Sequence, residues 1–200
     1  MERAWWENVL RVLARPREVF AGFHDDTDER ADARVEPINA VVALAAISAV
    51  SWSPETGRLM SDPAIDGLLV SVLLVLSGAL YGLVGYFVLG WLTKVGLATV
   101  AVRDGRRRPR QLLAYAAAPV ALSLVLLPVR LALYGGDVFE RGAERGSEVL
   151  AVLFLATVAW AIGLLVLAVH VVYDLDWSRA IAAVLLPAFV PAVAVAAVLT

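Results

Sequence analysis

Two ionisable side chains, His170 and Asp174, stand one helical turn apart near the end of a long apolar run. At this spacing an imidazole and a carboxylate share a helix face, and ionisable groups inside a membrane are functional candidates by default. Two interpretations therefore stand side by side. One is a proton or metal site. The other is ordinary hydration, because His170 lies within one turn of the run's end. A zinc site takes about three or four ligands, and only two are offered here.

The residue patterns of known intramembrane enzymes do not match this chain. A rhomboid-type serine is missing, and the two histidines, His24 and His170, are too far apart for an H-E-x-x-H zinc site. Gly135-Gly136-Asp137 precedes Tyr173-Asp174, which is the wrong order for a presenilin-type aspartyl pair. There is no phosphate-binding P-loop and no cysteine. We expect no catalytic residue, no cofactor and no metal, and hence a non-enzymatic protein.

The chain that carries these residues is strongly apolar. Sixty per cent of the 200 residues are apolar, compared with about 45–50% in soluble domains. Uncharged runs of about 18 or more residues are long enough to cross a bilayer as helices. The sequence predicts an all-α membrane protein with five transmembrane helices, at about 37–53, 66–92, 111–133, 149–172 and 178–199.

Charge placement predicts the orientation. Basic residues concentrate in residues 1–36 and again in residues 94–110, whereas the intervening loop 54–65 has only Arg58. The positive-inside rule assigns both basic regions to the cytoplasm. We therefore expect a protein of the cell (inner) membrane with its N-terminus inside and its C-terminus outside. The net charge of −2 gives no reason to expect a nucleic-acid partner.

The first 36 residues differ from the rest and form a predicted cytoplasmic region ahead of a membrane domain, residues 37–200. Apolar residues at helical spacing predict an amphipathic helix at 3–14 and a second at 16–23, which Pro16 starts. The charged stretch 24–36 is a linker. The amphipathic helices suit either the membrane interface or the protein's own cytoplasmic face.

Small residues form a stripe along the second predicted span. Gly78 and Gly82 are four residues apart and Gly85 follows. In lipid, faces with small residues let helix backbones approach closely. The stripe predicts either association with a second copy or packing against another helix of the same chain, and we favour the second.

A basic loop precedes the third span and contains Arg103, Arg106, Arg107, Arg108 and Arg110. Anionic lipid attracts such a loop with about 1 kcal/mol per basic residue near the surface. The alternative is that the loop only fixes the topology, and the two interpretations are compatible. The bilayer is the expected partner, with anionic lipid, a membrane protein and a second copy as further candidates.

Tyr115 and Pro119 stand one turn apart in the first turns of the third span. Pro119 removes a hydrogen bond and bends the helix. We expect this kink to swing Tyr115 and the basic loop against the N-terminal helices and so build a cytoplasmic face.

Several short patterns, in their order, resemble the Yip-domain family of Ypt/Rab-interacting membrane proteins, in its prokaryotic branch. Pro16-Arg-Glu-Val-Phe20 is similar to the family's opening helix, and the glycine-rich second span is similar to the corresponding segment of the family. The stretch from Arg110 to Pro119 is similar to the family's entry into the third span. Ser178 to Pro187 is similar to the final span. Ala114 replaces a glycine of the eukaryotic members, and their acidic cytosolic motif is missing. The resemblance implies a membrane-organising or scaffolding role. A small transporter or channel is the alternative.

Overall fold

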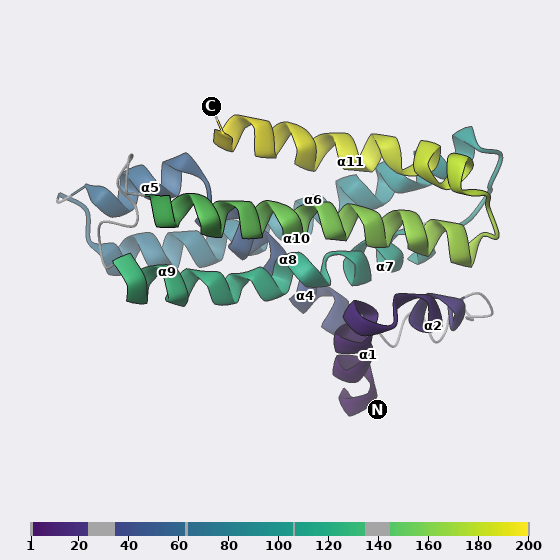
Figure 1. Cartoon of the computed structure of the whole chain (residues 1–200), viewed down its shortest axis with the longest axis horizontal. Helices are drawn as coiled ribbons and strands as arrows, with labels where there is room; N and C mark the ends of the chain where they lie inside the picture. Colours follow the sequence, from purple (N-terminus) through teal and green to yellow (C-terminus); the bar gives the residue numbers. More distant parts are fainter. Residues whose placement is uncertain (1, 24–34, 63, 106, 135–144, 200) are drawn as a thin grey trace.

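The computed structural model describes residues 2–23, 35–62, 64–105, 107–134 and 145–199. Every regular element within these ranges is a helix. Figure 1 shows that the long helices lie side by side along the longest axis of the molecule, with the N-terminal helices beside one end of them. The chain is therefore an all-α protein, as its sequence predicts.

The N-terminal region forms two short helices, α1 (Glu2–Ala14) and α2 (Pro16–Ala21). Pro16 stands at the first position of α2, where its missing N–H breaks no intrahelical bond. Arg15 leaves the helical conformation with φ −137° and so separates the two helices. The second helix ends at Ala21, two residues before the predicted boundary.

The five apolar segments begin with α4 (Val35–Ser51) and α6 (Gly67–Thr99). The third is divided into α7 (Arg107–Ala116), α8 (Ala118–Leu122), a 3-10 turn η1 (Ser123–Val125) and α9 (Leu126–Tyr134). The last two are α10 (Arg145–Val172) and α11 (Trp177–Leu199). Helix α6 runs seven residues beyond the predicted end at 92, because no proline interrupts Trp91 to Thr99 and neither Lys94 nor Gly96 ends the helix.

The stretch 54–65, expected as a loop, contains the additional helix α5 (Pro54–Ser61). The side chain of Ser53 accepts a hydrogen bond from the backbone N–H of Thr56, at 3.2 Å, and so caps the first turn. Pro54 follows at the first helical position. The segment is too polar and too short to cross a membrane, and Figure 1 shows it at the end of the bundle opposite α2.

Two helices are long and apolar enough to cross a membrane, Gly67–Thr99 and Glu148–Val172. Arg107–Ala116 and Ala118–Val129 together pass the same criterion but are bent by 41°. Counted as one span, they bring the number to three. The other two predicted spans contain the shorter apolar helices Ile38–Ser51 and Trp177–Phe189. Length and composition thus support a membrane protein with two or three clear spans.

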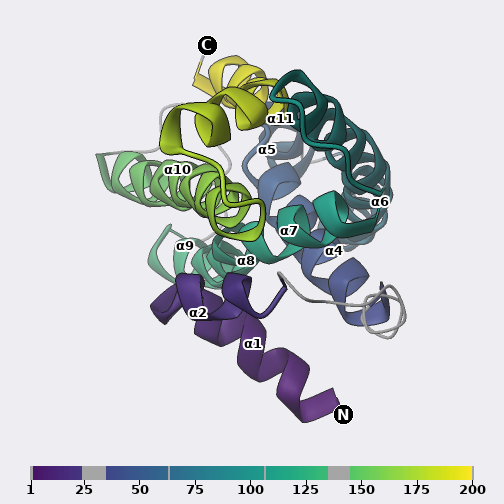
Figure 2. The ribbon, with the colours of Figure 1, turned by 90° about the vertical axis from the view of Figure 1, so that its right-hand side faces the viewer.

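The long helices form a ring, seen end-on in Figure 2. Helix α4 contacts α6, α6 contacts α11, α11 contacts α10, and α10 and α4 both contact α8. Helix α7 contacts α4, α6 and α10, so it crosses one end of the ring. The ring and its closed end define the interior of the molecule.

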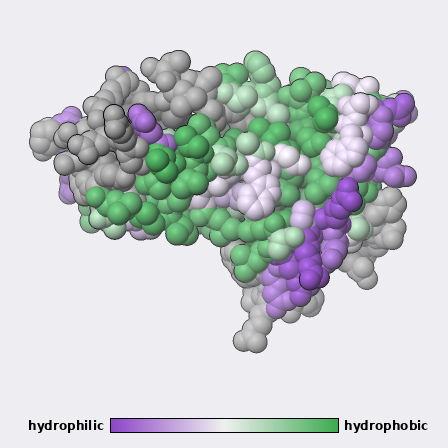
Figure 3. Space-filling model, viewed as in Figure 1, coloured by the Kyte–Doolittle hydropathy of each residue, from purple (hydrophilic) through white to green (hydrophobic). Residues whose placement is uncertain are grey.

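The outside of the ring is apolar. Large exposed hydrophobic side chains cover the outer faces of α6, α10 and α11, among them Leu69, Leu76, Leu80, Leu153, Leu185 and Phe189. Figure 3 shows this hydrophobic surface along the helices and a hydrophilic ridge over α1. A contiguous apolar surface of this extent is stable in lipid and unusual on a soluble monomer.

The buried core lies toward the end that carries the N-terminal helices. Val12, Phe20, Leu112 and Tyr115 have exposed fractions of 0–1% and belong to one cluster. Residues near the end of α10 and the start of α11 complete that cluster. The apolar faces of α1 and α2 are thus packed against the membrane domain, through Val9, Val12 and Phe20.

Candidate functional site

The break in the third apolar segment lies at Ala117, between α7 and α8. Pro119 is the second residue of α8 and lacks the N–H that would bond to the carbonyl of Tyr115. The N–H of Ala117 is shared between the carbonyls of Leu113 and Ala114, at 2.9 and 3.2 Å. The two halves meet at 41°. The bend tilts α7 across the end of the ring.

Tyr115 lies on the inner side of this tilted helix. Its exposed fraction is 1%, and its ring centroid is 5.0 Å from that of Phe23, with the planes inclined at 51°. Tyr115 therefore joins the kinked segment to the end of the N-terminal region. A side chain this deeply buried acts by packing and does not present itself to a partner.

The basic segment differs from the predicted loop. Arg107, Arg108 and Arg110 lie in helix α7, because the helix begins four residues earlier than expected. Of the described arginines in the predicted basic loop, only Arg103 precedes α7, and Arg106 lies outside the described residues. The predicted basic loop is thus a short connection followed by a basic first turn of helix.

The arginines of this segment have different surroundings. Arg103 and Arg107 are exposed. The Nε atom of Arg108 is 4.0 Å from the Oδ2 atom of Asp104. The side chain of Arg110 lies across Gly90 of α6, and its guanidinium carbon is 4.5 Å from the ring centroid of Phe87. Arg110 therefore packs between helices, whereas Arg103 and Arg107 face outward.

The glycine stripe of α6 packs within the chain. A Cβ atom on Gly78 would lie 2.6 Å from the Cα atom of Ile47, and one on Gly82 would lie 3.0 Å from the carbonyl oxygen of Val42. Both neighbours belong to α4. Gly85 does not share this face, because a Cβ there would meet nothing within 4 Å. Gly78 and Gly82 thus allow the close approach of α4 to α6, and Gly85 takes no part in it.

A contact that the sequence did not reveal joins two segments at the same end of the bundle. The hydroxyl of Tyr173, just after α10, donates a hydrogen bond to the Oδ2 atom of Asp104 at 2.5 Å. Burial, and then the hydrogen bond to Asp104, raise the pKa of Tyr173. Asp104 is the one acid within the basic stretch 94–110. A single acid among basic residues suggests that Asp104 has a polar partner. The sequence does not show that the partner is Tyr173, which lies 69 positions away.

His170 and Asp174 do not share a site. The Nδ1 atom of His170 is 2.5 Å from the carbonyl oxygen of Leu175, and its ring stacks on Trp177 at 4.2 Å. Asp174 is exposed and has φ 49°. Within the described part of the chain, no three His, Asp or Glu side chains could hold a metal ion together. His170 instead secures the turn between α10 and α11.

The kink, the N-terminal helices that pack beside it and the ring of apolar helices all lie within, or overlap, the part of the chain that one family model matches. The model is the Yip1 domain, and it matches residues 10–199. The chain belongs to the Yip1 family. No curated protein and no solved structure matches it. Membership in the Yip1 family identifies the chain as a membrane protein with this domain.

The Yip1 domain also contains a buried polar pair that the sequence analysis missed. The hydroxyls of Ser48 in α4 and Ser123 in η1 lie 2.8 Å apart. Both side chains are buried. The Ser123 hydroxyl donates to the carbonyl oxygen of Val120 at 2.6 Å, so in the pair the Ser48 hydroxyl donates to Ser123. Hydrogen bonds between serines hold helices together in lipid. The pair links α4 to the irregular turn below the kink.

The helices of the Yip1 domain line a partly enclosed cavity of about 220 Å³. Its walls come from α4, α6, α7, α8, α10 and α11, and they include Leu113, Phe154 and Leu165. All of the lining side chains are apolar. The cavity therefore offers no ligand to an ion and no hydrogen-bond partner to a polar substrate.

Proposed function

We propose that this Yip1-family chain is a non-enzymatic membrane protein with five spans, which organises the membrane or acts as a scaffold at its cytoplasmic surface. In this proposal the N-terminus is inside, the C-terminus is outside, and the protein lies in the cell membrane. The observation that carries the proposal is that the chain's basic and N-terminal segments gather at one end of an apolar ring.

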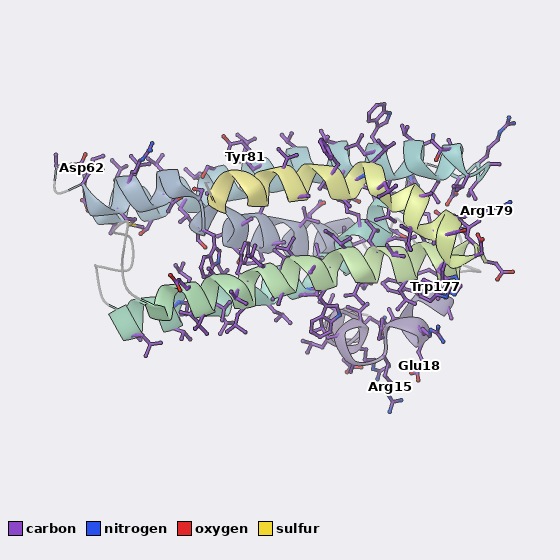
Figure 4. All side chains as sticks on the ribbon, turned by 45° about the horizontal axis from the view of Figure 1, so that its top comes forward. Arg15, Glu18, Asp62, Tyr81, Trp177 and Arg179 are labelled. Atoms are coloured by element: carbon purple, nitrogen blue, oxygen red, sulfur yellow. The ribbon has the colours of Figure 1, made fainter. Side chains whose placement is uncertain are left out.

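Helix placement supports the five-span arrangement. Figure 1 shows α2 and the connections from α6 to α7 and from α10 to α11 at one end of the bundle, with α5 at the other. Figure 4 shows Arg15 and Arg179 at that same end and Asp62 at the opposite one. Alternation of this kind is what five consecutive crossings require.

The two shorter helices also suit this arrangement. Helix α4 has 17 residues, which at 1.5 Å per residue reach about 26 Å, slightly less than the roughly 30 Å hydrocarbon core. A short span is accommodated by local thinning of the bilayer at modest cost. Helix α11 has 23 residues and is long enough. The mismatch at α4 is therefore small.

The surface chemistry supports an organising role. Arg11, Arg15, Arg17, Arg103, Arg107 and Arg179 are exposed at or near the proposed cytoplasmic end. Exposed cations beside the headgroup layer attract anionic lipid. Anionic lipid is accordingly the proposed partner, and a membrane protein or a second copy is the partner to be sought next.

The proposal is tested by lipid enrichment around the protein. A fluorophore is attached to Gly105→Cys in the cysteine-free chain, which is reconstituted in vesicles with a trace of acceptor-labelled anionic phosphatidylglycerol or zwitterionic phosphatidylcholine. We expect stronger energy transfer to the anionic lipid. Arg103→Gln combined with Arg107→Gln should weaken that preference. Arg58→Gln, at the opposite end, is the control.

Equal energy transfer to the anionic and the zwitterionic lipid would contradict an organising role that depends on lipid charge. An equal loss of the preference in Arg58→Gln would contradict it as well. The same vesicles test the transporter alternative. Flux of protons or potassium that depends on the protein would contradict the proposal and favour a transporter or channel.

A further inference from the structure

The interior cavity is larger than a packing defect. Its volume of about 220 Å³ is about half as large again as an engineered cavity of roughly 150 Å³ that binds benzene. Fifteen residues line it, and six are alanines: Ala45, Ala49, Ala116, Ala117, Ala161 and Ala188. Small side chains facing one another from different helices keep this space open.

The arrangement of helices explains why the space exists. Around the ring each long helix contacts its neighbours, so the middle is left to the side chains that point inward. The 41° bend carries α7 across one end, where Leu113 and Ala116 form part of the wall. The cavity is only partly enclosed, and Ala49 in its lining is exposed, so the cavity is open to the surroundings of the protein.

The chemistry of the walls restricts the occupant. A buried water needs about 2–4 polar partners, and the lining contains no polar side chain. An empty cavity would deprive the wall atoms of dispersion contacts on one side. In a protein whose outer faces are apolar and lie in lipid, the available apolar occupant is the hydrocarbon of the bilayer.

We propose that this cavity is a binding site for one hydrocarbon chain of a membrane lipid. The site is distinct from the lipid charge selection proposed above, because it lies within the ring and recognises the apolar tail. Leu165 and Ala116 are the most informative positions. They line the cavity and have exposed fractions of 4% and 2%, so lipid outside the ring does not reach them.

The test is photo-crosslinking in vesicles. The intact protein is reconstituted in phosphatidylcholine that contains a small fraction of the same lipid with a diazirine in its acyl chain. After illumination, mass spectrometry locates the labelled residues. We expect labels on Leu165 and Ala116 as well as on outward-facing residues such as Leu153. Labels on the outward-facing residues alone would overturn the proposal.

Cavity-filling variants supply the matched comparison. Ala161→Phe places a ring in the cavity, whereas Ala159→Phe places the same ring on an exposed position of the same helix. The first should remove the labels at Leu165 and Ala116 and the second should leave them. Should Ala161→Phe fail to fold, Ala188→Leu fills the cavity from α11, with exposed Ala182→Leu as its control. Labels that persist in a folded filling variant would overturn the proposal.

The choice of lipid separates this inference from the proposed function. Phosphatidylcholine has no net charge, so failure of the anionic-lipid experiment leaves the expected labels unchanged. Conversely, loss of the interior labels says nothing against charge selection at the surface.

Discussion

Polar side chains in the interior of this Yip1 domain are used to tie helices together. Ser48 and Ser123 form a pair between α4 and η1, and His170 secures the turn after α10. Tyr173 and Asp104 join two connections at the proposed cytoplasmic end. In an apolar surrounding an unpaired polar group is costly, so each of these contacts fixes the position of the helices that supply it.

The hydrogen bond from Tyr173 to Asp104 gives a prediction at this scale. Tyr173→Phe removes the donor and should lower the free energy of unfolding by about 1.5 kcal/mol, the lower end for a bond to a charged group, because Arg108 still faces the carboxylate. The measurement is thermal unfolding in a mild detergent. Tyr81→Phe, on the exposed face of α6, is the control, and an equal loss there would show that the bond does not matter.

The same residue predicts a pH dependence. Burial raises the pKa of Tyr173 in the folded protein, so the phenol keeps its proton where the unfolded chain, with a pKa of about 10, loses it. The stability that this proton supplies is present below about pH 10 and is lost as the pH rises further. Alkaline unfolding should therefore be steeper in the wild type than in Tyr173→Phe. Parallel curves would count against this assignment.

At the scale of elements, close helix contacts depend on which glycines face a neighbour. Gly78→Ala should push α4 from α6, because the added Cβ would approach the Cα atom of Ile47. The expected cost is about 1–3 kcal/mol, as for overpacking in a core. Gly85→Ala is the control and should be tolerated, since nothing lies within 4 Å of its Cβ position. Unfolding in detergent measures both variants.

The glycine comparison also tests the role of the stripe in association. If Gly78 mediated contact between copies, its substitution would reduce cross-linking between them and leave the stability of the single chain unchanged. Packing of Gly78 against α4 within one chain predicts that the substitution lowers the stability of the single chain and leaves cross-linking between copies unchanged.

The kink at Pro119 gives a second prediction for elements. Pro119→Ala restores a missing backbone donor and should straighten the junction of α7 and α8. Tyr115 would then move from Phe23, and thiol labelling of Gly105→Cys in the α6–α7 connection should become faster. Pro128→Ala, at an exposed position of α9, is the control. An unchanged labelling rate would show that the kink does not shape this face.

The sequence predicted the elements that follow from local pattern. The uncharged runs of α6 and α10 were found, although α6 extends seven residues beyond its predicted end and α10 begins four residues before its predicted start. Pro16 and Pro119 correctly marked a helix start and a bend. Helix α5 was missed, although Ser53 and Pro54 together form a capped helix start. The pairing of Tyr173 with Asp104 and the separation of Gly85 from the packing face depend on tertiary arrangement, which local pattern does not specify.

At the scale of the whole molecule, the ring has a polar end and an apolar belt. The hydrophilic ridge of α1 in Figure 3 lies beside the apolar surface of the long helices, and the N-terminal helices are packed into the core at that end. Of the described apolar residues of these helices, Val9, Val12 and Phe20 are buried, whereas Leu10 is exposed. In the proposed topology, the charged side chains of α1 and α2 lie at the membrane surface and the exposed leucines and valines contact lipid.

The orientation of the molecule supplies the last prediction. Single cysteines at Gly105 and Asp62, at opposite ends of α6, should react from opposite sides of the membrane. Asp62→Cys should react with an impermeant thiol reagent in intact cells, and Gly105→Cys only after permeabilisation. A reporter that is active only outside the cytoplasm should be active when it is fused after Thr200. The physical reason is the excess of basic residues on the Gly105 side, which the positive-inside rule keeps in the cytoplasm. Labelling of both cysteines from the same side would show that α6 does not cross, and the reverse pattern would invert the proposed topology.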